Sequence, residues 1–138
     1  MLHGLVIAAG LALFGVAAAG CGVPRVLGWR EDLARLRPLN RQIFWTYSGY
    51  ILCTNLCMAV LATFAPGWLL SGTPLAAAVS GYICIYWGAR FVIQFVYYDR
   101  SDAPSGALYE FAHYAFAAIF LYLTLVFGAC CWTNAGAP

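Results

Sequence analysis

The sequence predicts an all-α membrane protein of four transmembrane helices, with a short interfacial amphipathic helix between the first and the second. The chain of 138 residues is 64% hydrophobic and only 9% charged, whereas a soluble domain carries about 25% charged residues. Each of four apolar segments, at approximately 2–21, 43–65, 74–97 and 107–128, has about the 20 residues that a helix needs to cross a bilayer. The connections between them are short, so residues 1–138 are expected to form a single integral membrane domain.

The third segment contains an arginine within its apolar run. Arg90 lies roughly two helical turns, about 10 Å, before the segment ends at Tyr97. A charge at that depth is costly unless it has a partner or a water-filled cavity. Tyr86 and Gln94 each lie four residues from Arg90, so the three side chains share one face of the helix.

Two segments carry small residues at helical spacing, a pattern that lets membrane helices approach closely. The first segment has Gly4, Ala8, Ala12, Gly15 and Ala19, and the third has Ser80, Gly81, Cys84 and Gly88. These seams predict close packing against a neighbouring helix, in this subunit or another, and the presence of two of them suggests association into a homo-oligomer or docking against a larger membrane partner. No Lys or Arg precedes the first apolar run, so we expect a retained helix rather than a cleaved signal peptide.

Residues 22–41 form the long polar stretch and predict the interfacial helix, bracketed by Pro24 and Pro38. The stretch holds five arginines against Glu31 and Asp32, which by the positive-inside rule makes it cytoplasmic. The turn at 98–106 then lies on the same side and both termini lie outside. All seven basic residues are arginine, a composition that favours a bacterial cytoplasmic membrane, and a net charge of +2 is too small to suggest nucleic-acid binding.

Two connections are expected at the outer face. The uncharged loop after Pro66 has a Leu69-Leu70 pair that suits a dip into the membrane interface. Residues 133–138 are expected to form a short terminal tail.

Polar side chains of three segments are expected to meet in the inner leaflet. Antiparallel packing of the third and fourth segments puts Arg90 near the level of His113 and Gln94 near Glu110, and the long arginine side chain can reach Glu110 one turn away. The candidate site for a ligand, an ion or a proton consists of Tyr47, Tyr50, Tyr86, Arg90, Gln94, Glu110, His113 and Tyr114.

Three interpretations of this cluster stay open. Arg90 and Glu110 can form an internal ion pair that sets helix register. The cluster can instead be a site that opens toward the cytoplasm, because ionisable residues within a membrane are functional candidates by default. Arg90 can also extend its side chain to the headgroups. In a functional site Glu110 and His113 would be the titratable pair, since histidine is the side chain that changes charge near neutral pH.

Metal and cofactor patterns are incomplete, so we expect no metal site, cofactor or catalytic residue. Glu110 and His113 have the spacing of one half of a di-iron motif, which needs a second pair and further carboxylates. His3 and His113 lie in opposite leaflets and cannot bind one haem. The six cysteines include no C-x-x-C pair, and Cys53 and Cys57 suit helix packing.

These features favour a small non-enzymatic protein, either a transporter or channel-like module or an accessory membrane subunit. The alternative is a membrane-embedded enzyme or redox subunit that binds a lipid-soluble substrate such as a quinone. Tyrosine and histidine side chains would then hydrogen-bond the quinone oxygens, and a visible absorption band would distinguish this class from the first.

Overall fold

The computed structural model describes residues 1–98 and 106–136, so the turn predicted at 98–106 lies mostly outside the described residues. The elements in order are α1 (Leu2–Val26), α2 (Trp29–Ala34), α3 (Pro38–Phe64), α4 (Pro66–Leu69), α5 (Pro74–Val96) and α6 (Ala107–Ala135). Over the described ranges every element is a helix. Helices α1, α3, α5 and α6 are long and apolar enough to cross a membrane. The prediction of an all-α fold with four membrane-length helices is confirmed.

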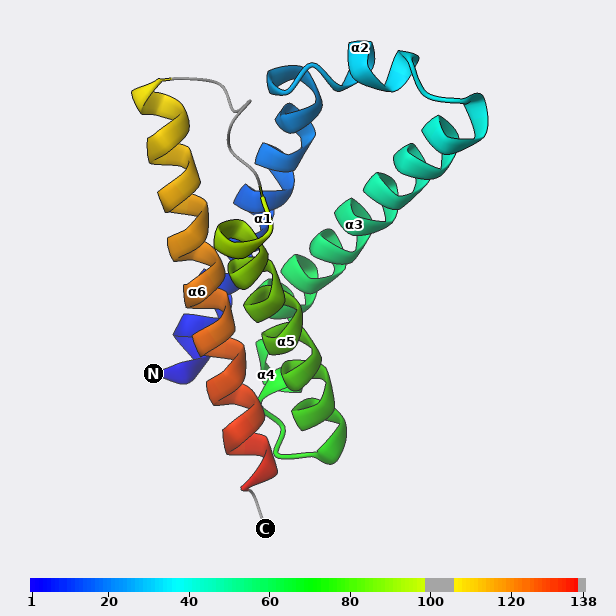
Figure 1. The fold of residues 1–138 in the computed structure, drawn as a ribbon. Helices are drawn as coiled ribbons and strands as arrows, with labels where there is room; N and C mark the ends of the chain where they lie inside the picture. The colour runs from blue at the N-terminus through cyan, green and yellow to red at the C-terminus, as the bar shows by residue number, and fades with distance from the viewer. Residues whose placement is uncertain (99–105, 137–138) are drawn as a thin grey trace.

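The four long helices form two packed pairs. Helices α5 and α6 lie side by side, α1 packs against α3, and α1 also contacts α6 (Figure 1). The second half of α3 belongs to the bundle, whereas its first half diverges from α5 and α6. Helix α2 lies across the wide end of the angle between α1 and α3 (Figure 1). The molecule is therefore closed at the α4 end and open at the α2 end.

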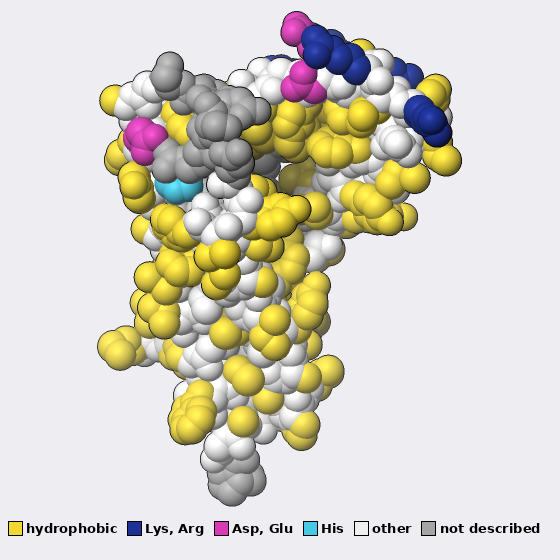
Figure 2. All heavy atoms as spheres, viewed as in Figure 1, with side chains coloured by type: hydrophobic (Ala, Val, Ile, Leu, Met, Phe, Trp, Pro, Cys, Tyr) yellow, Lys and Arg dark blue, Asp and Glu magenta, His cyan; other side chains and the backbone are white. Residues whose placement is uncertain are grey.

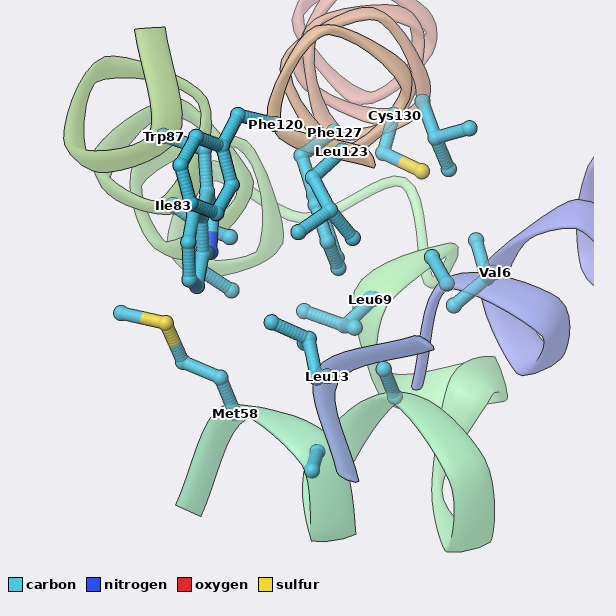
Figure 3. Packing of buried hydrophobic residues seen from close by; sticks show 14 residues of the cluster. Val6, Leu13, Met58, Leu69, Ile83, Trp87, Phe120, Leu123, Phe127 and Cys130 are labelled. Carbon is cyan, nitrogen blue, oxygen red and sulfur yellow. The ribbon is translucent and has the colours of Figure 1, made fainter. Parts of the chain in front are cut away.

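The core lies at the closed end, where four long helices and α4 meet (Figure 3). Its largest fully buried side chains include Trp87, Phe127, Leu13 and Leu69. The expected dip of Leu69 into the membrane interface is wrong, because Leu69 is 1% exposed and packs in this core. Helix α4 begins at Pro66 and turns the chain inward, which gives Leu69 protein neighbours in place of lipid.

The small-residue seam of α5 packs against α6, as its spacing predicts. A Cβ atom added to Gly81 would lie 3.2 Å from the Cys131 sulfur, and one added to Gly128 would lie 3.3 Å from the Cys84 sulfur. Farther along, a Cβ atom added to Gly88 would lie 3.4 Å from the Thr124 methyl carbon. The two helices thus approach closely because each places small residues opposite a thiol or hydroxyl side chain of the other.

The seam of α1 faces away from the core. Gly4 and Gly15 are exposed, and a Cβ atom at either would meet nothing within 4 Å. The close approach is made instead by Gly10, where a Cβ atom would lie 2.8 Å from the Thr63 backbone nitrogen and 3.1 Å from the Ala59 carbonyl oxygen. Helix α1 has small residues on several faces, so spacing alone does not select the buried one.

The ends of the helices differ from their predicted positions. Helix α1 continues through Pro24 to Val26, and the Leu27 amide donates to the Val23 carbonyl at 2.9 Å beyond the proline. A proline this close to the carboxyl end removes only one helical hydrogen bond, so the helix tolerates it. The helix that follows is correspondingly short, with six residues in α2, and Leu33 is its buried side chain.

The first residues of the predicted terminal tail are helical, because α6 runs to Ala135, and Asn134 anchors the end of this helix. The Asn134 side chain is 5% exposed. Its amide nitrogen donates to the carbonyls of Leu69 and Cys130, each at 2.7 Å, and the Gly72 amide donates to its oxygen at 2.8 Å. Gly72 has φ 69°, a left-handed conformation that glycine adopts without strain. Asn134 thus holds the loop between α4 and α5 against α6.

Replacing Ser80 with alanine is expected to leave stability unchanged or to raise it by about 1 kcal/mol. Ser80 is fully buried in α5, and no group in residues 1–98 or 106–136 accepts or donates a hydrogen bond at its hydroxyl. Removing an unsatisfied buried hydroxyl relieves its desolvation cost. An SDS titration followed by circular dichroism measures the change, and a loss of more than about 1 kcal/mol would show that the hydroxyl has a partner.

Candidate functional site

The charged side chains gather at the open end of the molecule. Figure 2 shows Arg, Asp and Glu side chains along the α2 end and one acidic and one histidine side chain at the start of α6, with mainly hydrophobic side chains below them. Five arginines, all exposed, lie on the segment from the end of α1 to the start of α3: Arg25, Arg30, Arg35, Arg37 and Arg41. This distribution fits a membrane protein with one water-exposed end and an apolar surface over the rest of its length.

Arg90 lies in the last two turns of α5 and is held by aromatic side chains. A guanidinium nitrogen donates to the Tyr98 hydroxyl. The guanidinium carbon lies 5.2 Å from the centre of the Tyr98 ring and 5.6 Å from the centre of the Phe120 ring, both within cation–π range. Across the described ranges Arg90 makes no other hydrogen bond and no ion pair, so it is not paired with Glu110. Among residues 1–98 and 106–136, no carboxylate therefore neutralises its positive charge.

Gln94 and His113 form the polar contact between α5 and α6. The Gln94 amide nitrogen lies 3.0 Å from His113 Nδ1 and donates to it in the tautomer whose proton is on Nε2. His113 is 7% exposed, and the ring of Tyr114 meets its ring edge-on with the centres 5.2 Å apart. The hydrogen bond and the ring contact together fix the orientation of the imidazole.

The register of α5 against α6 differs by one turn from the expected one. The sequence places Arg90 level with His113, whereas the structure pairs Gln94 with His113 and puts Arg90 beside Phe120. The stacking of Trp87 on Phe120, with ring centres 5.2 Å apart, sets this register. Glu110, one turn before His113, then lies level with the end of α5. Bulky aromatic packing, rather than an ion pair, decides how far the two helices slide.

Tyr86 connects α5 to α3 through its hydroxyl, which donates to the Asn55 side-chain oxygen at 3.2 Å. Asn55 is buried, and the sequence-based cluster did not include it. A lone amide within an apolar span needs a hydrogen-bond partner, and that rule could have identified Asn55. Tyr98 was also missed, because it follows the last turn of α5 and was assigned to the loop.

Tyr47 and Tyr50 lie apart from the rest of the cluster. Both are exposed on the diverging first half of α3, where they line a groove of about 290 Å³ together with Gln42, Ile43 and Thr46. Over residues 1–98 and 106–136, neither hydroxyl hydrogen-bonds to another member of the predicted cluster. The structure therefore divides the predicted site into a polar end on α5 and α6 and a tyrosine face on α3.

No metal centre is formed by the described residues. Within these ranges no three His, Cys, Asp or Glu side chains lie close enough together to hold a metal ion. The six cysteines are free thiols. Phe120 stacks on Trp87 and on Phe116, with ring-centre distances of 5.2 and 6.0 Å, and Trp87 and Phe120 are buried in the core.

No protein-family model matches the chain, and no curated protein or solved structure matches it significantly. The functional interpretation therefore depends on the geometry of the site.

Proposed function

We propose that this is a small non-enzymatic membrane protein, either a transporter or channel-like module or an accessory subunit, whose functional site is the polar cluster around Arg90. The observation that carries the proposal is the environment of Arg90. It has one hydrogen bond, to Tyr98, two aromatic contacts and, over the described residues, no carboxylate partner. An arginine that only set helix register would be neutralised, because an unpaired charge in a membrane is costly. Arg90 is instead arranged to attract an anion.

The neighbouring polar residues fit the same role. Gln94 and His113 form a hydrogen-bonded pair one turn from Arg90, and Glu110 lies one turn farther toward the open end. His113 and Glu110 provide two groups able to exchange protons beside a cation. Such a row suits the coupling of anion binding to proton movement, as in transporters that use chains of acidic and histidine side chains.

The proposed orientation follows the charges. Helix α2, with the five arginines around it, lies in the interface on the cytoplasmic side of a bacterial membrane, and both chain ends lie outside. The outward seam of α1, which includes the exposed Gly4 and Gly15, is free to contact a second copy or a larger membrane partner.

Replacing Arg90 with alanine is expected to lower anion flux by about tenfold or more, because a charge-assisted hydrogen bond contributes about 1.5–3 kcal/mol. The purified protein is reconstituted into liposomes, and uptake of chloride and of inorganic phosphate is measured with and without a proton gradient. Arg41→Ala, which removes the same charge from an exposed position at the start of α3, is the matched control and should retain flux.

The other outcomes decide between the remaining interpretations. If Arg90→Ala no longer elutes as a folded species, while Arg90→Lys folds and transports, the charge is required for both folding and function. If Arg90→Ala transports as well as the parent protein, the site is wrong. If the parent protein carries neither anion faster than empty liposomes, the transporter and channel roles are excluded and the accessory subunit remains.

The second candidate is a redox or enzymatic subunit that binds a quinone. It is favoured by the aromatic row of Trp87, Phe120 and Phe116, which lies on the same two helices as the hydrogen bond between Gln94 and His113. A quinone ring would lie against Phe116, the half-buried member of the row, while Gln94 and His113 hydrogen-bond its oxygens. A visible absorption band, or a quinone extracted from the purified protein by solvent, would favour this candidate over the first.

A further inference from the structure

The bundle opens sideways next to Arg90. The hydrogen bond from Tyr86 to Asn55 joins α5 to α3. The first half of α3 diverges from α5 toward the α2 end (Figure 1). On α5, Arg90 lies one turn beyond Tyr86 on the same face. On α3, Ile51 lies one turn before Asn55 on the same face. Arg90 and Ile51 thus lie one turn beyond the Tyr86–Asn55 contact on α5 and α3, and we name the opening between the two helices on this side the α3–α5 notch.

The two walls of the notch differ in character. Arg90 lies on the α5 side, where its guanidinium contacts Tyr98 and the Phe120 ring of α6. Only one of its five N–H donors is hydrogen-bonded within the described part of the chain. The α3 wall is apolar and aromatic, with Ile51 55% exposed and Tyr47, one turn farther, 63% exposed. Figure 2 shows the surface hollowed between the start of α3 and the end of α5, below α2. One wall is therefore suited to an anion and the other to a hydrocarbon chain.

The rim of the notch is also positive. The segment from the end of α1 to the start of α3 carries five exposed arginines against Glu31 and Asp32, an excess of three positive charges. Clusters of arginine at the membrane surface attract anionic lipid headgroups, each residue contributing about a fivefold gain in affinity. The positive rim therefore attracts anions, which are also the ligands that Arg90 can bind.

We propose that the α3–α5 notch binds the phosphate headgroup of a membrane lipid, with Arg90 on the phosphate and the exposed Ile51 and Tyr47 wall against the acyl chain. This deepens the proposed function, on which it rests, by naming an anionic amphiphile as the ligand of the Arg90 site. The notch opens to the side, and its α3 wall is apolar over two turns. A small soluble phosphate would use the arginine and leave that wall without a role.

The test compares the lipids that stay with the purified protein. The full chain is placed in bilayer discs of equal amounts of phosphatidylglycerol and phosphatidylcholine, released, and examined by native mass spectrometry. We expect the parent protein to retain phosphatidylglycerol in preference, and Arg90→Gln to reduce that preference about tenfold. Arg41→Gln, the matched control on the exposed rim, should reduce it less, because an exposed charge is screened by salt. Equal retention of both lipids by the parent protein would overturn the proposal.

Two further measurements distinguish a lipid phosphate from a soluble one and keep the proposal testable if Arg90→Gln does not fold. Glycerol 3-phosphate carries the head chemistry without acyl chains, and it should not displace the bound lipid; displacement would mean that the ligand is a soluble anion. Ile51→Glu puts a negative charge on the exposed α3 wall without disturbing the core. It should lower phosphatidylglycerol retention even if Arg90→Gln fails to fold, and unchanged retention would contradict the lipid site.

The lipid measurement and the flux measurement fail separately. If Arg90→Gln loses anion flux but keeps its lipid preference, the lipid inference is wrong and the proposed function stands. If both flux and lipid preference are independent of Arg90, the proposed function is wrong as well.

Discussion

Replacing Gly10 with leucine is expected to separate α1 from α3 and to cost about 3 kcal/mol or more. A Cβ atom at this position would lie 2.8 Å from the Thr63 backbone nitrogen and 3.1 Å from the Ala59 carbonyl oxygen. Backbone atoms inside a helix cannot rotate away, so the whole of α3 must move. That movement would open the contact between α1 and α3, on which Leu13 and Met58 depend for their burial.

The matched control for Gly10 is Gly15 on the same helix. Gly15 is exposed, and a Cβ atom there meets nothing within 4 Å, so Gly15→Leu should change stability by less than about 0.5 kcal/mol. An SDS titration followed by circular dichroism measures both variants in the same detergent. Equal stability of Gly10→Leu and Gly15→Leu would show that α1 does not pack on α3 through this face.

Replacing Asn134 with leucine is expected to lower stability by about 3 kcal/mol, because three hydrogen bonds are lost and two of the partner residues, Leu69 and Cys130, stay buried. The Leu69 carbonyl and the Gly72 amide lose the side chain that connects them to α6. The Cys130 carbonyl loses the hydrogen bond that the Asn134 side-chain nitrogen also donates to it. The chain between α4 and α5 should then detach, and proteolysis in the region of Gly72 should become faster.

Two substitutions separate the hydrogen bonds from the bulk of the side chain. Asn134→Asp keeps an acceptor for the Gly72 amide but cannot donate to either carbonyl, so it should be at least as destabilising as the leucine variant. Thr133→Val changes the preceding residue, whose exposed hydroxyl bonds only to carbonyls of its own helix, and should cost less than about 0.5 kcal/mol. A fully stable Asn134→Leu would mean that the loop is held by Leu69 packing alone.

The four membrane helices could be predicted because their signal is local. A run of about 20 apolar residues can be identified without knowing its neighbours, since insertion into lipid stabilises an apolar helix whatever packs beside it. The α5 seam was predictable for a related reason. Gly81 and Gly88 lie at helical spacing on a face without large side chains, and a second helix can approach closely only along such a face.

The polar site was predicted less completely because it depends on relations between helices. Gln94 and His113, two members of the predicted cluster, are hydrogen-bonded, but the partner of Arg90 depends on how α5 slides against α6. That register is set by the stacking of Trp87 on Phe120, which has no sequence signature. Tyr47 can lie next to the residues of α5 and α6 only if α3 stays parallel to α5. The divergence of α3 depends on tertiary packing and cannot be read from the sequence.

The length of α6 has a consequence for where its first charge resides. A helix of 29 residues extends about 43 Å, whereas the hydrocarbon layer is about 30 Å thick. Tilt of the usual size, about 20°, shortens that span by only a few ångströms, so close to two turns must project into the headgroup layers. Glu110 lies in the first turn of α6, where a carboxylate also benefits from the positive end of the helix dipole. A thicker bilayer would draw this carboxylate toward the hydrocarbon layer, and a thinner one would expose it further to water. Membrane thickness would therefore change the hydration of Glu110.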